Sequence, residues 1–137
     1  MDLPKMIFEE KFDEVKKIIT QNDINLNAVN VKKNTLLLAA IDTDNINFIK
    51  FLLEQGADSN YLTKGIDLPL NYAIETSVEA EDYMDDVDEV KTDIIELLLE
   101  YGADMMKEDN FNRSPYEFAK NYHIPAQKLF EKMKNNL

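Results

Sequence analysis

The 137-residue chain contains no cysteine, no tryptophan and a single histidine. The lack of cysteine excludes a disulfide framework, a thiolate metal site and a cysteine nucleophile. With three glycines and four prolines, the chain also has few residues suited to tight turns. This scarcity favours helices over a sandwich or barrel of many short strands.

Long apolar runs are missing as well. No stretch approaches the roughly 18 uninterrupted apolar residues that a membrane span requires. The first residues lack the basic lead and apolar core of a signal peptide, so we expect a cytoplasmic protein with no membrane contact. The length suggests one domain, and 45% hydrophobic with 31% charged residues suggests an ordinary folded chain.

The charge balance is one-sided. There are 27 acidic and 15 basic residues, which gives a net charge of −12. A field of this sign repels phosphate backbones and attracts basic proteins, so nucleic acid is not an expected partner. An alternative is that the acidity serves only solubility, and composition leaves both open.

A short phrase recurs along the chain. Gly56-Ala57-Asp58 has a near copy at Gly102-Ala103-Asp104, and each follows an apolar run with helical spacing, at 48–55 and 94–101. The glycines stand where a helix end favours a left-handed residue. A third copy lies 33 residues before the first and has Asp23 in place of glycine.

A second phrase precedes two of these helices and recurs near the end of the chain, at Thr35–Ala40, Leu68–Ala73 and Ser114–Ala119. Thr35 and Ser114 can cap exposed backbone N–H groups. In the second and third phrases, proline follows Leu68 and Ser114 and occupies the first helical position. Each unit is therefore predicted to hold a short helix, a turn, a longer apolar helix and a connecting loop.

These phrases resemble the ankyrin repeat, whose T-P-L-H-x-A and G-A-D-x-N phrases recur about every 33 residues. The resemblance implies an all-α solenoid of about four helix-turn-helix units in one domain, at roughly 1–27, 28–60, 61–106 and 107–137. This chain departs from the family phrase at the histidine position, which holds Leu38, Asn71 and Glu117.

The third unit is longer than the others. Thr35 to Leu68 spans 33 residues but Leu68 to Ser114 spans 46, so 13 extra residues lie within Ser77–Lys91. One interpretation is a solvated loop or a charged extension of the helices. Another is an acidic arm that grips a basic partner, with candidate residues Glu79, Glu81, Asp82, Tyr83, Asp85, Asp86 and Asp88. A calcium site is disfavoured because the segment lacks the glycine of an EF-hand loop.

The resemblance also implies where a partner binds, namely the loop tips and the outward side of each first helix, which line a concave surface. The candidates are Val31, Lys32, Asn34, Asp42 and Thr43, then Leu62, Lys64, Asp67, Glu75 and Thr76, then Asn110, Phe111, Arg113, Asn121 and Tyr122. The aromatic residues Phe111 and Tyr122 are of the type that dominates binding energy. Phe111 folding back as a cap on the last unit is the alternative.

We therefore expect a non-catalytic protein that binds a basic partner and is a monomer when free. No catalytic residue, cofactor or metal is predicted, and the only histidine, His123, is expected to be structural. One alternative is a stoichiometric inhibitor, such as an immunity protein that neutralises a toxin. A more remote alternative is an enzyme with a cleft formed by the insertion.

Overall fold

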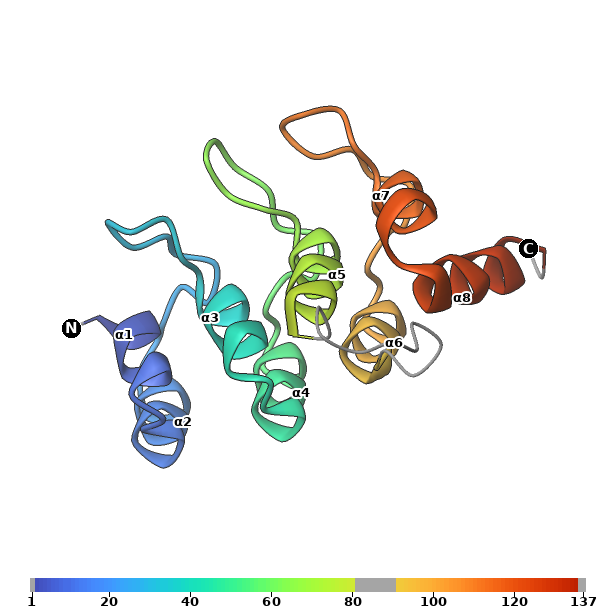
Figure 1. The fold of residues 1–137 in the computed structure, drawn as a ribbon. Helices are drawn as coiled ribbons and strands as arrows, with labels where there is room; N and C mark the ends of the chain where they lie inside the picture. The colour runs from blue at the N-terminus through green and yellow to red at the C-terminus, as the bar shows by residue number, and fades with distance from the viewer. Residues whose placement is uncertain (1, 81–90, 136–137) are drawn as a thin grey trace.

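The computed structural model describes residues 2–80 and 91–135, without the side chains of 78–80. This part of the chain holds helices and loops and no strand, as the sequence predicts (Figure 1). The helices are α1 (Leu3–Phe8), α2 (Phe12–Gln21), α3 (Leu36–Thr43), α4 (Ile46–Glu54), α5 (Pro69–Ala80), α6 (Asp93–Glu100), α7 (Pro115–Tyr122) and α8 (Ile124–Asn135).

The helices form pairs that stack side by side (Figure 1). Within each pair the two helices contact each other, as α1 does α2 and α3 does α4. The first helices of successive pairs also pack together, α1 on α3, α3 on α5 and α5 on α7. In Figure 1 the three long loops leave the stack from the same edge, above the row of first helices.

Side-chain caps start the helices where the sequence predicts them. The Thr35 hydroxyl accepts a hydrogen bond from the Leu38 N–H at 3.1 Å, and the Ser114 hydroxyl accepts one from the Glu117 N–H at 3.2 Å. Such bonds satisfy backbone donors that have no partner within the helix.

The predicted glycine stops are also present. Gly56 and Gly102 adopt φ values of 104° and 92°, a conformation that other residues rarely reach. After Gly56, the Ala57 N–H donates to the Leu52 carbonyl at 3.0 Å, and after Gly102 the chain repeats this bond. These bonds close the ends of α4 and α6. Near the aspartate-substituted copy, α2 ends at Gln21 and the next residue is extended instead.

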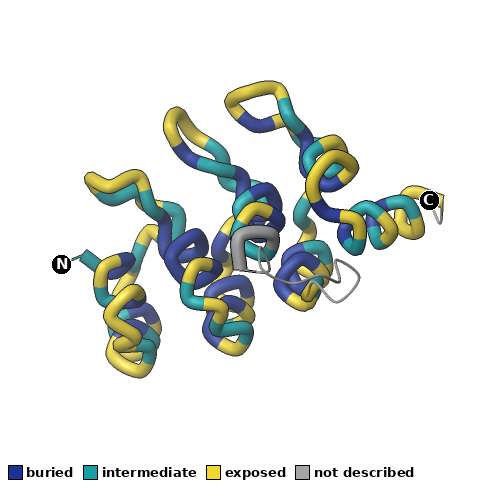
Figure 2. The backbone as a smooth tube through the Cα atoms, in the orientation of Figure 1, coloured by how far each residue is buried: buried dark blue, intermediate teal, exposed yellow. Residues whose placement is uncertain are grey.

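The core is continuous through the stack (Figure 2). Buried side chains come from every pair, and Leu37, Ala40, Leu52, Leu70, Ala73, Leu97, Leu98 and Ala119 are among them. Three aromatic residues, Phe51, Tyr116 and Phe118, are only half-buried and pack against this core. A cationic side chain lies beside each ring, Lys16 at Phe51, Lys134 at Tyr116 and Arg113 at Phe118, and such groups stay near solvent.

The insertion starts as helix. α5 has 12 residues, whereas α3 and α7 have 8 each, so 77–80 continues the helix. Glu79 belongs to this extension. The other candidates of the acidic arm, Glu81, Asp82, Tyr83, Asp85, Asp86 and Asp88, lie outside the described residues.

Replacing either Leu52 or Leu98 with alanine should lower the free energy of unfolding by about 2–5 kcal/mol, because each side chain is fully buried between helix pairs and leaves a cavity. Met106→Ala, at an exposed position, is the control and should change it by less than about 0.5 kcal/mol. Urea denaturation measures both effects. Leucine variants that unfold at the wild-type midpoint would contradict the stacking.

Candidate protein-binding surface

The loop tips are held by side chains at their bases. In the first loop, Asn30 Oδ1 accepts hydrogen bonds from the N–H groups of Lys32 and Asn34, at 3.0 and 2.9 Å. In the last loop, Asp109 Oδ1 accepts from Phe111 and Arg113, at 2.8 and 2.9 Å. The same turn thus forms twice, and it orders the tips without burying them.

Neighbouring loops are joined by a repeated contact. Asn27 Oδ1 accepts from the Asp58 N–H at 3.0 Å, and Asn60 Oδ1 accepts from the Asp104 N–H at 2.7 Å. Asn60 also donates to the Gly102 carbonyl at 2.8 Å. Because the two contacts occupy equivalent places in successive units, they set a common spacing between the loops.

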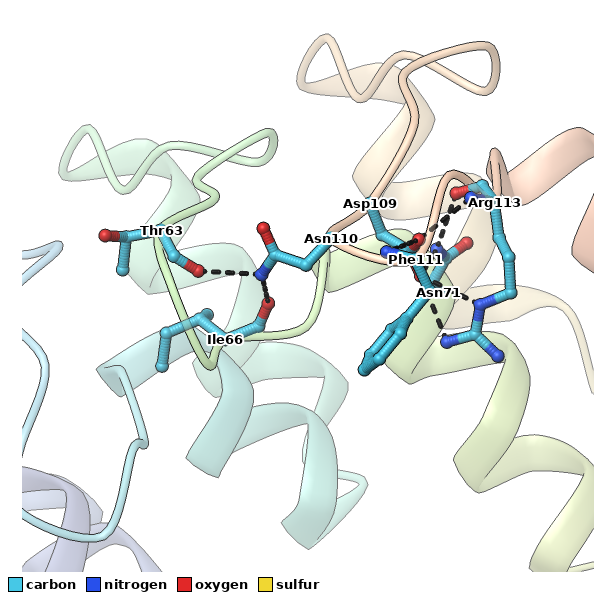
Figure 3. Close-up of polar contacts among 7 residues, drawn as sticks. All are labelled: Thr63, Ile66, Asn71, Asp109, Asn110, Phe111 and Arg113. Carbon is cyan, nitrogen blue, oxygen red and sulfur yellow. Dashed lines mark hydrogen bonds and ion pairs between the residues drawn. The ribbon is translucent and has the colours of Figure 1, made fainter.

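The last loop is tied to the one before it (Figure 3). Asn110 Nδ2 donates to the carbonyls of Thr63 and Ile66, at 3.0 and 3.2 Å. Asn71, at the position where the family phrase has histidine, donates to Asp109 Oδ2 at 3.2 Å. The amide of Asn110, which the sequence suggests for a partner, is therefore already used within the chain.

Arg113 is also engaged internally. Its Nε and Nη2 atoms each lie 3.0 Å from Asp109 Oδ2, and its guanidinium lies over the rings of Phe111 and Phe118, at 5.4 and 5.0 Å. Burial alone would raise the pKa of Asp109, but the hydrogen bonds from Arg113 and Phe111 outweigh it and lower that pKa. Arg113 thus supports the loop and the ring of Phe111.

Phe111 and Tyr122 are the most exposed aromatic side chains of the described residues. Phe111 is 73% exposed and Tyr122 is 64% exposed, the latter beside the ring of Phe118 at 5.2 Å. Phe111 therefore does not fold back as a buried cap. Apolar rings held in water by an ordered loop are suited to a partner's surface.

The first helices contribute acidic groups. Asp42 on α3 and Glu75 on α5 are both exposed, and these two helices pack against each other. Asp42 Oδ1 accepts from the Tyr72 hydroxyl at 2.9 Å, and burial together with this carboxylate raises the pKa of Tyr72. The hydroxyls of Thr43 and Thr76 donate to carbonyls of their own helices, at 2.7 and 3.2 Å.

The remaining sequence candidates differ in exposure. Val31, Lys32, Lys64 and Asn121 are exposed, whereas Asn34, Leu62 and Asp67 are half-buried. We keep the name concave face, which the family resemblance supplies, for these residues together with Asp42, Glu75, Phe111 and Tyr122. All of them belong to the loops or the first helices, which Figure 1 places along one edge of the stack.

Part of this face comes from α1, which the repeated phrases did not indicate. Lys5 and the 41% exposed Phe8, both from α1, line a cleft of about 250 Å³ with Asp2, Asn30, Lys32 and Asn34. Asp2-Leu3-Pro4 stands 33 residues before Thr35-Leu36-Leu37, and Asp2 caps α1 as Thr35 caps α3. That spacing could have revealed a first helix whose open side belongs to the concave face.

The only histidine caps a helix. His123 is buried, and its Nδ1 accepts the Ala126 N–H at 3.1 Å, as Asn45 accepts the Phe48 N–H at the start of α4. Burial lowers the pKa of His123. A protonated ring would lose its acceptor atom and place a positive charge at the positive end of α8. The neutral ring is therefore the structural form.

Stability should consequently fall as the pH drops through about 6.5 toward the lowered pKa of folded His123, because the unfolded chain takes up the proton first. Above this window the His123 ring is neutral in both the folded and the unfolded chain, so stability no longer changes with its protonation. His123→Asn keeps a capping acceptor and removes the titration, so its urea midpoint should change less between about pH 7.5 and 5.5. Equal pH dependence in both proteins would contradict the assignment.

A second test concerns the base of the last loop. Asp109→Ala should lower the free energy of unfolding by about 1–3 kcal/mol, because two backbone N–H groups and the Arg113 guanidinium lose their hydrogen-bond acceptor. Asp109→Asn retains the acceptor that Asn30 provides in the first loop and should cost less. Urea denaturation compares the two, and equal losses would show that the backbone bonds contribute nothing.

Within residues 2–80 and 91–135 no helix is long and apolar enough to cross a membrane. The same part of the chain gathers no group of three His, Asp or Glu side chains suited to a metal ion.

Stacked helix pairs with loops along one edge define a helical-repeat solenoid. A family model described as ankyrin repeats (3 copies) matches residues 6–109, and the chain belongs to this family, as its repeated phrases predict.

The chain is also similar to two known ankyrin-repeat proteins, one in sequence and one in structure. The chain is 30% identical over 106 residues to the Ankyrin repeat and LEM domain-containing protein 1 homolog of Caenorhabditis elegans. This match covers 76% of the chain but 13% of that protein, so the chain spans only a small part of its length. The ankyrin repeat domain of Bcl-3, a member of the IkappaB protein family, superposes with a TM-score of 0.66 at 19% identity, covering 85% of this chain and 45% of the other. The second comparison supports the fold alone.

Proposed function

We propose that this chain is a non-catalytic module that binds a partner protein through its concave face. Ankyrin repeats are in general protein–protein interaction modules. The observation that carries the proposal here is the pair of exposed rings, Phe111 and Tyr122, held by an ordered loop and a helix on the same face. An interface gains affinity chiefly from such rings when they are buried.

The partner is proposed to present a basic patch toward the middle of the face. Asp42 and Glu75 are exposed there. Asp42 also lines a hollow of about 140 Å³, together with Asp44, Asp93 and Lys91. The net charge of −12 would accelerate the encounter with a basic protein. The acidic residues of 81–90 would add to the same attraction. A cytoplasmic monomer that avoids membranes and nucleic acid fits this charge.

The titratable groups support binding over catalysis. A carboxylic general acid needs a raised pKa. Hydrogen bonds lower the pKa of Asp2, and those of Asp109 outweigh its burial to the same effect. His123 is used as a buried helix cap, so its ring faces no open cleft.

The binding surface can be tested with a photo-crosslinking amino acid. Placed at Glu75 it should capture a partner from the native cell, whereas the same group at Lys17, on the exposed side of α2, should not. Equal capture of the same partner from both positions would contradict the concave face as the binding surface.

With the captured partner purified, Phe111→Ala and Tyr122→Ala should each weaken binding by about 1–2 kcal/mol and leave the melting temperature nearly unchanged, since both rings are exposed. Tyr101→Ala, a 37% exposed aromatic at the end of α6, is the matched control and should bind normally. Isothermal titration calorimetry measures the change. Normal binding by both variants would move the interface to the acidic segment at 81–90.

A further inference from the structure

The positive charges of this acidic chain are unevenly placed on the concave face. Lys32 and Lys33 lie at the tip of the first long loop, Lys64 lies at the tip of the second, and Lys5 lies on α1. The loop tips are exposed in Figure 2. The face is therefore acidic over α3 and α5 but basic at its N-terminal end.

The geometry brings Lys5 and Lys32 together and directs Lys33 toward the second loop. Lys5 and Lys32 line the cleft beside Phe8, although they come from different units. The stem of Lys33 reaches across to the second loop, where its Cδ would lie 3.7 Å from a Cβ built on Gly65. This contact places Lys33 next to the residue that follows Lys64.

The charge of these ammonium groups is offset only in part, by Asp2 beside Lys5 and Lys32. The salt bridges of the described residues join Lys11 to Glu9, Lys50 to Glu54 and Arg113 to Asp109, and none involves Lys5, Lys32, Lys33 or Lys64. Asp2 is the carboxylate in the cleft. Its Oδ1 accepts from the Lys5 N–H and from Asn30 Nδ2, at 3.1 and 3.2 Å, in its capping role. Two lysines and one aspartate leave the cleft with a net positive charge.

Apolar surface accompanies the charge. Val31, between Asn30 and Lys32, is 92% exposed, and Phe8 forms one side of the cleft. A ligand for this place needs carboxylates for the ammonium groups and an apolar side chain for Phe8.

We propose that the N-terminal end of the concave face binds an acidic segment of the partner protein and takes one of its apolar side chains into the cleft against Phe8. The inference rests on the proposed function and adds a second charge of opposite sign. A partner with a basic patch and an acidic segment can then dock in one orientation only, since reversal brings like charges together. A nucleic acid fits less well, because its phosphates would extend over Asp42 and Glu75.

The test uses a synthetic, fluorescently labelled peptide of about twelve residues in which glutamates surround one phenylalanine, a matched peptide with lysine for glutamate, and a single-stranded oligothymidylate. Fluorescence anisotropy gives the affinities at about 50 and 500 mM NaCl, and amide chemical shifts locate the bound peptide.

The tip variant carries Lys32→Gln, Lys33→Asn and Lys64→Gln. Asparagine suits the left-handed backbone of Lys33, as Asn112 does in the last loop. The control variant carries Lys17→Gln, Lys50→Gln and Lys132→Gln on α2, α4 and α8, with the same change of net charge.

The acidic peptide should bind the wild type and the control variant equally, and the tip variant about tenfold more weakly at low salt. High salt should remove the difference, and the shifted amides should include those of Lys5, Phe8 and Lys32. Equal binding by the tip variant, shifts elsewhere, no binding, or tighter binding of the oligothymidylate would each overturn the inference. The crosslink at Glu75 decides the proposed function separately, so capture there with no acidic-peptide binding would reject only this inference.

Discussion

Each helix pair depends on the next pair to bury its apolar side. Ile41, Leu52, Ile74 and Leu98 are almost completely buried, and the helices that carry them contact the neighbouring pairs as well as their own partners. A single pair could not remove this surface from water, so stability comes from the stack. Because successive pairs must repeat the same packing, the loops that join them are forced to leave from one edge.

That edge becomes a binding surface through the chemistry of its polar side chains. Asn30 and Asp109 satisfy the backbone N–H groups of their own loops, and Asn27 and Asn60 join each loop to the next. Loops with their donors satisfied in this way are ordered before a partner arrives. A partner then loses less conformational freedom on binding, and exposed rings such as that of Phe111 are presented ready for contact.

The distribution of charge gives this surface a direction. The chain is strongly acidic as a whole, yet the lysines of the first two loops form a basic end beside the exposed Asp42 and Glu75. Long-range attraction depends mainly on the total charge, whereas the orientation of a docked partner depends on local potential. The net acidic charge therefore concerns the encounter with the partner, and the basic N-terminal end concerns its orientation once docked. Added salt should weaken both electrostatic attractions.

The sequence by itself determined the fold, the helix caps at Thr35 and Ser114 and the glycine stops, because these depend on local backbone preferences that recur with the repeat. Only the tertiary structure decided which candidates remain open to a partner. Spacing cannot show that Asn110 and Arg113 are used inside the chain, or that Phe8 and Lys32 border one cleft. Those contacts join different units, and they arise from the directions that side chains take once the units are stacked.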